Sequence, residues 1–452
     1  MLLERSFGQL KVILPMNRKE AEDFVYQSYL NAQTYQDYEA KDSKKRRPEL
    51  LKDCIRAKAG TPCTVVTGSK GKGSVAKMIA GMLQQAHKVG LMTSPHIVDF
   101  CERFQIDGVP VSDEDFAKYM TAIRPQIEAV SQNIPPGQCI SPMGIQTLFA
   151  LEYFGAKETT FDVFECGKGA KYDDVNNVVH RYAVINRIFA EHTRELGDTL
   201  EAIAEDKAHV INGEQTCVFV ARQTEEVLKV IQKRASDYGV PLKVYGADFH
   251  AEQIRYTKQG MTFDVDIGGV KYEDITVPLL GRHQTENCAL AMAFCKEVLG
   301  GLQTEAVRDA MKTLVWPGRM EVISNEPFML LDACINPASC AHVIEVIGHL
   351  GLDRIVCIIG IPSDKDYAGV VRKMHAISDK IILTQSQNPH YLFSQEQCDT
   401  MAREGIETVW KASVPDAISY AKTTNLPIVI LGTTSVVSEV KQYQGGNECA
   451  CI

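Results

Sequence analysis

Glycine, lysine and serine lie close together in one short segment, Gly68-Ser69-Lys70-Gly71-Lys72-Gly73-Ser74. Glycines let backbone N–H groups turn towards phosphate oxygens, Lys72 can reach β- and γ-phosphates, and the Ser74 hydroxyl can bind Mg²⁺. A β-branched run precedes the segment, and apolar residues at helical spacing follow it. This order of strand, loop and helix is typical of a phosphate-binding loop, whose helix N-terminus adds a positive dipole. An ordinary tight turn is the alternative, and the flanking elements favour phosphate binding.

Further acidic and imidazole side chains follow two apolar runs. One run ends on Glu165, and the run 182–188 leads to Glu191 and His192. At the carboxyl end of a strand in a nucleotide-binding sheet, a carboxylate lies beside the phosphate loop and can bind or position Mg²⁺. A solvent-exposed edge position is the alternative for Glu165. The glycine-containing segment 167–170 that follows it favours a site.

Lys207 falls on the apolar face of a predicted helix over residues 200–211. Ile203 and Ala204 lie on the same face. Lysines are rarely buried without a partner. Its side chain could extend outward along its apolar stem, with the ammonium in water. Alternatively, it is a desolvated amine with a lowered pKa, available for covalent chemistry or for a charge partner. Helical spacing does not decide between the two.

The whole chain has the composition of a globular protein of several domains. Its 452 residues are too many for one core, and 45% are apolar and 23% charged. The net charge of −9 argues against a nucleic-acid partner, and no apolar run approaches the roughly 18 residues of a membrane helix. The 14 cysteines include no C-x-x-C pair, which is typical of reduced thiols in a cytoplasmic protein. The first residues do not read as a signal peptide.

Alternating strand and helix patterns predict an α/β protein. The stretches 242–256, 261–267 and 270–277 read as an added antiparallel group. The last part repeats strand–helix units, which predict a parallel sheet wrapped by helices. Trp316-Pro317-Gly318 reads as a joint, so we place the domains at residues 1–317 and 318–452.

Taken together, these residues resemble the folylpolyglutamate synthases, within the wider family of Mur-type amino-acid ligases. The resemblance runs from about Tyr35 to Val440 and rests on short motifs in a fixed order. These are the loop Gly68–Ser74, Ser94-Pro95-His96, Glu165-x-Gly167-x-Gly169 with Asp173 and Asn176, Glu191-His192, Leu196-Gly197-Asp198-Thr199, Lys207, His283-Gln284 with Asn287, Trp316-Pro317-Gly318-Arg319, Asp332 with Asn336-Pro337, and Asp364-Lys365-Asp366.

The resemblance implies a P-loop-type central ATPase domain with a mostly parallel sheet and a smaller Rossmann-like C-terminal domain that closes on it. It implies an ADP-forming ligase of one-carbon metabolism. ATP phosphorylates a substrate carboxylate, an amino acid's amine attacks the acyl phosphate, and an amide results. The implied acid is a folate, and the implied amino acid is L-glutamate. We expect a cytoplasmic monomer with neither a nucleic-acid nor a membrane partner.

Roles carry over to this sequence by position. The nucleotide would bind Asn287, Arg319, Asp332 and the whole loop, Gly68, Ser69, Lys70, Gly71, Lys72, Gly73 and Ser74. Mg²⁺, at two sites, would bind Ser74, Glu165 and His192. The catalytic residues would be Lys72, Asp173, Arg319 and Lys207, which matches the family's carbamylated lysine. Carbamylation needs a neutral amine, which the apolar helix face would favour. The substrate-binding residues would be Ser94, Pro95, His96, Ile335, Thr433 and Ser435.

Several positions depart from the family pattern, and they lie on the substrate side. The family has Asp-Gly-Ala-His-Asn-Pro where this chain has Asp332-Ala333-Cys334-Ile335-Asn336-Pro337, and Ile335 cannot form the hydrogen bond of that histidine. Thr433 replaces a serine, and Ser435 replaces an aromatic residue. Met143-Gly144 replaces Phe-Glu, and Glu191 replaces an aspartate.

These departures leave two alternatives to a folate ligase. One is a Mur-type ligase with a different acid and amine. The other is a nucleotide-binding regulator that has lost turnover. A GTPase switch is disfavoured because the sequence has no Asn-Lys-x-Asp segment, and a purely structural protein leaves the ordered motifs unexplained.

Overall fold

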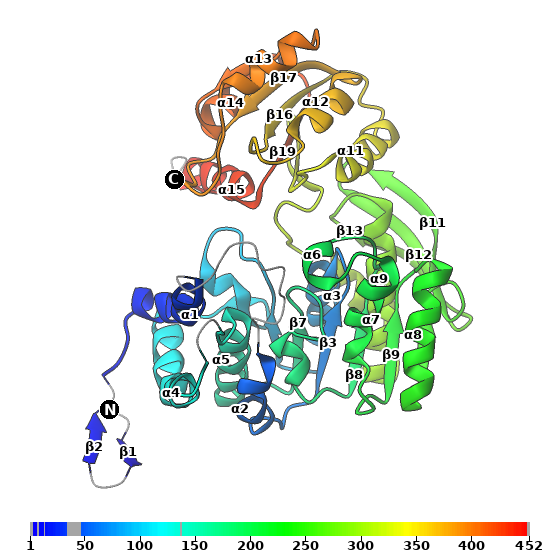
Figure 1. Cartoon of the computed structure of the whole chain (residues 1–452). Coiled ribbons are helices and arrows are strands. Elements are labelled where there is room, and N and C mark those ends of the chain that lie inside the picture. The colour runs from blue at the N-terminus through cyan, green and yellow to red at the C-terminus, as the bar shows by residue number, and fades with distance from the viewer. Residues whose placement is uncertain (1–2, 7–8, 13, 34–46, 136–137, 450–452) are drawn as a thin grey trace.

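We analysed a computed structural model of the chain, which describes residues 3–6, 9–12, 14–33, 47–135 and 138–449. Tyr35, where the family resemblance begins, lies outside these residues. A large body carries most of the chain, and a smaller body contains the residues after about 320 (Figure 1). Strands β1 (Leu3–Ser6) and β2 (Gln9–Val12) pair antiparallel, apart from both bodies (Figure 1).

An eight-stranded sheet forms the centre of the large body. The first six strands pair parallel, and each of the last two pairs antiparallel with the strand before it. In sheet order the strands are β10 (Leu242–Val244), β9 (Cys217–Val220), β8 (Tyr182–Ile185), β3 (Cys63–Thr67), β7 (Phe161–Glu165), β4 (Val89–Met92), β5 (Phe104–Ile106) and β6 (Val109–Pro110).

Helices cover both faces of this sheet, as its apolar strands require. Val65 and Val66, neighbours on β3, belong to two different cores. The core that contains Val66 also contains residues of α3 (Lys72–Leu83), α9 (Arg282–Leu299) and α10 (Thr304–Lys312). The core that contains Val65, on the other face, also contains residues of α1 (Arg18–Gln33), α2 (Lys52–Arg56), α4 (Asp113–Ser131), α5 (Pro142–Ala156), α7 (Leu200–Lys207) and α8 (Glu225–Tyr238). Shorter pieces are α6 (Thr193–Leu196) and the 3₁₀ turns at Pro48–Leu50, Phe100–Arg103, Asp174–Asn177 and Ala208–Val210.

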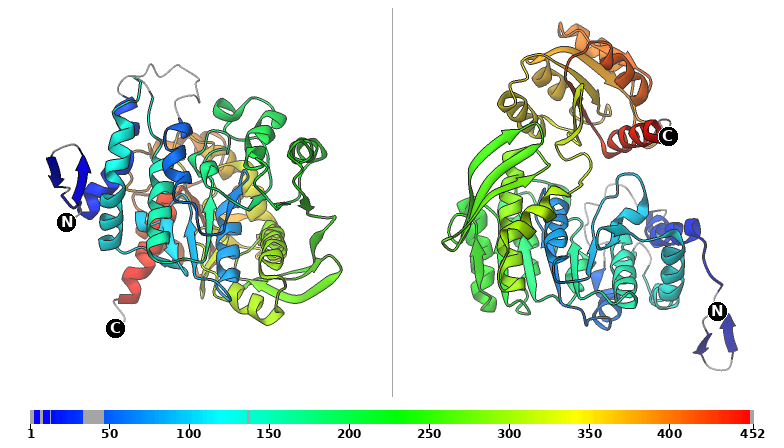
Figure 2. Two further views of the ribbon diagram at one scale, coloured as in Figure 1. Left: turned by 90° about the horizontal axis from the view of Figure 1, so that it is seen from below. Right: turned by 180° about the vertical axis from the view of Figure 1, so that it is seen from behind.

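A second, three-stranded antiparallel sheet lies beside α9 and extends towards the smaller body (Figures 1 and 2). Its strands are β11 (Phe249–Thr257), β12 (Gly260–Ile267) and β13 (Val270–Val277). At its far end Tyr256 stacks on His349, with ring centroids 4.0 Å apart, and the Tyr256 hydroxyl donates to Glu345 at 3.2 Å. This sheet therefore joins the two bodies.

The smaller body is a six-stranded sheet between two helical layers. Its strands, in sheet order, are β14 (Glu321–Asn325), β15 (Phe328–Asp332), β19 (Ile428–Gly432), β16 (Ile355–Gly360), β17 (Ser378–Thr384) and β18 (Val409–Lys411). Only β14 runs antiparallel. One face carries α11 (Pro337–His349), α12 (Tyr367–His375) and α13 (Glu396–Arg403), and the other carries α14 (Val414–Lys422) and α15 (Thr434–Cys449).

The predicted fold class is confirmed: an α/β chain with a large, mostly parallel sheet and a second, smaller sheet. The joint at 316–318 lies between α10 and β14, and the domain limits stay a prediction. One local expectation was wrong. Strand β10 joins the main sheet and not the antiparallel group, because α8 returns the chain to pair parallel with β9. Helix α5 begins at Pro142, where Ser141 caps it. The polar strand β14 was not expected.

Asp162 on β7 provides a test of this core, because its side chain is a buried carboxylate. Burial raises its pKa to about 7, from an ordinary value of 3.8. Between these values the folded state binds more protons than the unfolded state, so stability falls as pH rises. We expect Asp162→Asn to raise the free energy of unfolding at both pH values, and by roughly 1–3 kcal/mol more at pH 8 than at pH 5.

Urea unfolding of the two proteins at both pH values measures this difference. Asp237→Asn, on exposed α8 surface, is the control and should change stability little at either pH. Equal stabilisation by Asp162→Asn at pH 5 and pH 8 would contradict the expectation.

Candidate active site

The phosphate loop connects β3 to α3 through backbone that needs glycine. Gly71, at the N-terminus of α3, has φ of +76°, in the left-handed region. A Cβ on Gly73 would lie 2.6 Å from the indole ring of Trp316 and 3.1 Å from Oε2 of Glu165. The loop therefore lies directly against the joint between the bodies and against the end of β7.

Asn186, just past β8, holds the loop from behind. Its Nδ2 donates to the Lys70 carbonyl and to Oδ1 of Asn287, both at 3.0 Å, and its Oδ1 accepts from the Arg187 N–H. Asn287 in turn donates to Gln284 at 3.0 Å. Asn186 was not among the residues predicted from the sequence. An amide directly after a buried strand next to β3 is the signal that could have found it.

Two lysines meet at one backbone oxygen of the loop, the Gly68 carbonyl. Lys72 Nζ donates to it at 3.2 Å and to the Ser69 carbonyl at 3.4 Å. Lys207 Nζ donates to it at 2.8 Å and to Oε1 of Glu191 at 2.9 Å. The Lys207 side chain is only 1% exposed, so the buried interpretation is confirmed. Burial lowers its pKa, and the charge of Lys72 lowers it further.

Glu165, at the end of β7, is buried beside the loop. Its Oε2 accepts the Ser94 N–H at 2.9 Å. Burial raises its pKa, and the charges of Lys72 and Arg319 oppose this rise. In the part of the chain that the structure describes, neither Oε1 of Glu165 nor the Ser74 hydroxyl has a hydrogen-bond partner. Because Mg²⁺ usually takes one or two protein oxygens beside phosphate oxygens and water, this donor set fits it.

The other predicted metal and catalytic residues, His192 and Asp173, make their contacts elsewhere than with Glu165 and Ser74. His192 has a left-handed backbone and a side chain 44% exposed, and its Nε2 lies 3.9 Å from Glu191. Asp173 caps the 3₁₀ turn after it and accepts the Gly167 N–H at 2.8 Å. Among the described residues, no three His, Cys, Asp or Glu side chains form a metal-binding group. The assignments of His192 and Asp173 therefore stay predictions.

Residues from the smaller body reach the loop. Lys70 Nζ hydrogen-bonds the Ser339 hydroxyl at the start of α11. Burial raises the pKa of Asp332, at the end of β15, against the charges of Arg319 and Lys70. Burial lowers the pKa of His283 to about 4, and the charges of His342, Lys70 and Arg319 add to this effect. The nucleotide side of the site is thus a region of positive charge at the seam between the bodies.

A cavity of about 780 Å³ lies further along the same seam. The segment Pro95–Val98 forms its wall on the large body. From the smaller body come residues after β17 and on α15, among them Asn388, Tyr391, Ser435 and Tyr443. Of the predicted substrate-binding residues it therefore collects Pro95, His96 and Ser435. Ser94 lies next to them, and its backbone N–H donates a hydrogen bond to Glu165. Ile335 and Thr433 do not line the cavity. Thr433 instead caps α15.

Comparisons with known proteins agree with this geometry. The profile of the Mur ligase middle domain matches residues 66–295, and that of the Mur ligase, glutamate ligase domain matches residues 318–431. The chain is 29% identical to the dihydrofolate synthase/folylpolyglutamate synthase of Bacillus subtilis, over 83% of this chain and 89% of that one. It is 27% identical to the folylpolyglutamate synthase of Lacticaseibacillus casei, over 83% and 88%.

Solved structures show the same fold. A Mycobacterium tuberculosis folylpolyglutamate synthase complexed with ADP and AMPPCP superimposes with a TM-score of 0.81, at 23% identity, covering 93% of this chain and 99% of that one. A folylpolyglutamate synthase complex with AMPPCP and folate superimposes with a TM-score of 0.76, at 26% identity, covering 95% and 100%.

The contact between Gly73 and Trp316 makes the indole a reporter of the loop. Trp316 and Trp410 are the two tryptophans of the chain, and Trp410 lies on β18, in the smaller body. In a Trp410→Phe variant, we expect ATP to change the emission of Trp316, because phosphate would bind next to the ring. In Trp316→Phe, ATP should leave the remaining emission unchanged. The reverse pattern, or no change in either variant, would contradict this placement.

Proposed function

This chain belongs to the Mur ligase family, whose relatives of the folylpolyglutamate synthase type are ATP-dependent ligases, and we propose that it joins a folate carboxylate to the amine of L-glutamate. The observation that supports this proposal most strongly is that the side chains of Lys72, Lys207 and Glu165 all lie at one phosphate loop. ATP would phosphorylate the carboxylate, and the amine would displace phosphate from the acyl phosphate, leaving an amide and ADP.

The reaction needs positive charge around the transferred phosphoryl group, because a carboxylate is a poor electrophile until one oxygen becomes a leaving group. Lys72 would leave the carbonyls of Gly68 and Ser69 to bind the β- and γ-phosphates. Arg319, whose charge reaches both Glu165 and Asp332, would contact the γ-phosphoryl when the bodies close. Mg²⁺, when bound, would supply further charge, held by Ser74 and Glu165 and with His192 as the proposed ligand of a second ion.

Lys207 would act at this site as a carbamate, formed on its amine by CO₂. Its lowered pKa favours the neutral amine that carbamylation requires. A carbamate is anionic, so it would lose the ion pair with Glu191 and could turn towards Lys72 or the metal. Asp173, which accepts the Gly167 N–H, would position the segment that follows Glu165.

The acid would lie against the segment Ser94–Val98, and the amino acid would enter from α15. The Ser94 N–H donates a hydrogen bond to the carboxylate of Glu165, so an acid substrate on this wall would lie next to the phosphate loop. The departures from the family favour a second candidate, a ligase with another acid or amine. Ile335, Thr433 and Ser435 are all on the smaller body, which contributes the other wall of the cavity.

We also propose that the enzyme works as a cytoplasmic monomer without nucleic acid. All the cysteines whose state the structure describes are free, as in a reducing compartment. No helix within the described ranges is long and apolar enough to cross a membrane.

The proposed reaction is tested by ADP release. With ATP and Mg²⁺, we expect release only when an acid and an amino acid are both present, and fastest with a folate and L-glutamate. The panel should include folates, pteroate and unrelated acids, each with a set of amino acids. Release with another pair alone would support the second candidate. Tight ATP binding with no release under any pair would point to the regulator and contradict the ligase.

Lys207→Ala tests the role of the buried amine. We expect turnover to fall by roughly 10²-fold or more, with the Kd for ATP changed by less than about threefold, because the lysine acts on the transition state. Added bicarbonate should not restore activity to the alanine variant. Intact-mass measurement in CO₂-buffered solution should show a carbamate on the wild type only. Wild-type turnover in Lys207→Ala would show that the lysine is structural.

Lys207→Arg is the matched control, because it keeps the charge but cannot be carbamylated in the same way. If the ammonium alone matters, the arginine variant keeps activity. If the carbamate matters, the arginine variant is as slow as the alanine variant.

A further inference from the structure

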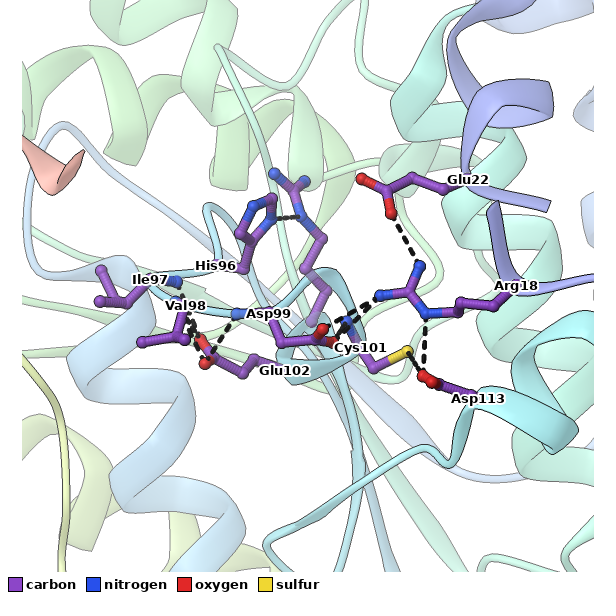
Figure 3. Close-up of polar contacts among 10 residues, drawn as sticks. Arg18, Glu22, His96, Ile97, Val98, Asp99, Cys101, Glu102 and Asp113 are labelled. Atoms are coloured by element: carbon purple, nitrogen blue, oxygen red, sulfur yellow. Dashed lines mark hydrogen bonds and ion pairs between the residues drawn. The ribbon is translucent and has the colours of Figure 1, made fainter. Parts of the chain in front are cut away.

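The cavity wall Pro95–Val98 is held by the carboxylate of Glu102. That carboxylate accepts the backbone N–H groups of Ile97 at 2.8 Å, Val98 at 3.1 Å and Asp99 at 3.0 Å (Figure 3). Asp99 in turn accepts the Cys101 N–H at 2.7 Å and so closes a capping box with Glu102. The backbone of the wall therefore has little freedom to move.

Arg18 anchors this cap to helix α1. Its guanidinium donates to Asp99 at 3.1 Å, to Asp113 at 2.9 Å and to Glu22 at 2.8 Å (Figure 3). It also lies over the ring of Phe116, 5.0 Å from the centroid. Three carboxylates on one guanidinium tie α1, the wall and the start of α4 together.

Arg103 donates a hydrogen bond to the ring of His96. Arg103 Nε donates to Nδ1 of His96 at 2.9 Å, and its Nη1 donates to Gln146 at 2.9 Å. The imidazole also packs against Phe100, with centroids 5.5 Å apart. An arginine is always protonated and can only donate, so Nδ1 must carry a lone pair. A neutral His96 therefore carries its proton on Nε2.

Burial and the guanidinium of Arg103 both favour the neutral form of His96. Burial lowers its pKa, and Arg103 lowers it further, against Glu102, Glu22 and Asp99. From the other side of the cavity it faces Glu439, Tyr391 and Tyr443. Among the described residues, none accepts a hydrogen bond from Nε2, although His96 lines the cavity.

We propose that Arg103 fixes His96 as a neutral Nε2–H donor on the cavity wall, where it hydrogen-bonds an acceptor oxygen of the acid substrate. This inference rests on the proposed function. A neutral donor suits a carbonyl or carboxylate oxygen and rejects an ammonium group, so it selects the acid and not the amine. His96 is then a substrate-binding residue, and Arg103, Glu102 and Arg18 are positioning residues that act through it.

The protonation state can be read without turnover. In protein labelled with ¹⁵N-histidine, the His96 signals, assigned by their loss in His96→Phe, should show the neutral Nε2–H tautomer at pH 7.5. In Arg103→Met the same signals should show a mixture of tautomers and titrate at higher pH, because the donor and the positive charge are gone. An imidazolium or an Nδ1–H tautomer in the wild type would overturn the inference.

Kinetics test the role in binding. His96→Phe keeps the ring on Phe100 but has no donor, so we expect the KM for the folate to rise about tenfold, with kcat and the KM for ATP and L-glutamate little changed. His96→Gln keeps an N–H donor and should stay within about threefold of the wild type. His250→Gln, at a half-exposed histidine of β11 outside the cavity, is the matched control and should behave as the wild type.

The outcomes separate this inference from the proposed function. If no pair of acid and amino acid drives ADP release, the proposed function fails, and the proposed substrate contact fails with it, whatever the tautomer. If turnover is found but His96→Phe leaves the KM for the acid within twofold, the inference fails and the proposed function stands. Should Arg103→Met not fold, as its melting curve would show, the wild-type tautomer and the His96 variants still decide.

Discussion

Two ammonium groups hydrogen-bonded to one backbone oxygen set the character of this site. Lys72 and Lys207 both donate to the Gly68 carbonyl, and Glu191 is the carboxylate that pairs with Lys207. Placing two ammonium groups this close together is costly unless anions compensate them, the more so because Lys207 is buried. Glu191 pairs with Lys207, and among the described residues no carboxylate forms an ion pair with Lys72, which leaves an excess of positive charge at the loop. A polyphosphate is the natural partner for such an excess, and a carbamate on Lys207 would be a second one.

The other side chains of the site lie at the seam between the two bodies. Trp316 lies on Gly73, Lys70 reaches Ser339, and the charge of Arg319 acts on Glu165 and Asp332. The phosphate loop gives the site one half, which Asn186 holds to the central sheet. The smaller body brings the other half.

Local periodicity and turn chemistry were enough to predict the α/β class and the glycine loop, whereas helical spacing left the buried and exposed alternatives for Lys207 open. They failed where tertiary contacts decide. Strand β10 is short and could equally have paired with β11, and only its position after α8 shows that it belongs to the main sheet. Asn186 looks like any polar residue after a strand until the loop folds over it. The proton on His96 depends on Arg103, and no spacing rule connects an imidazole to a guanidinium seven positions on.

Helix α11 contacts the larger body at both of its ends. Lys70 hydrogen-bonds Ser339 at its start, and Tyr256 stacks on His349 at its end. Between them His342 contacts His283 of α9, with ring centroids 5.8 Å apart. Ile97, on the wall Pro95–Val98, packs against the core of the smaller body beside α15. Any movement that widens the cavity must therefore break the contact of Ile97, so the width of the cavity is tied to apolar packing as well as to the polar contacts at the phosphate loop.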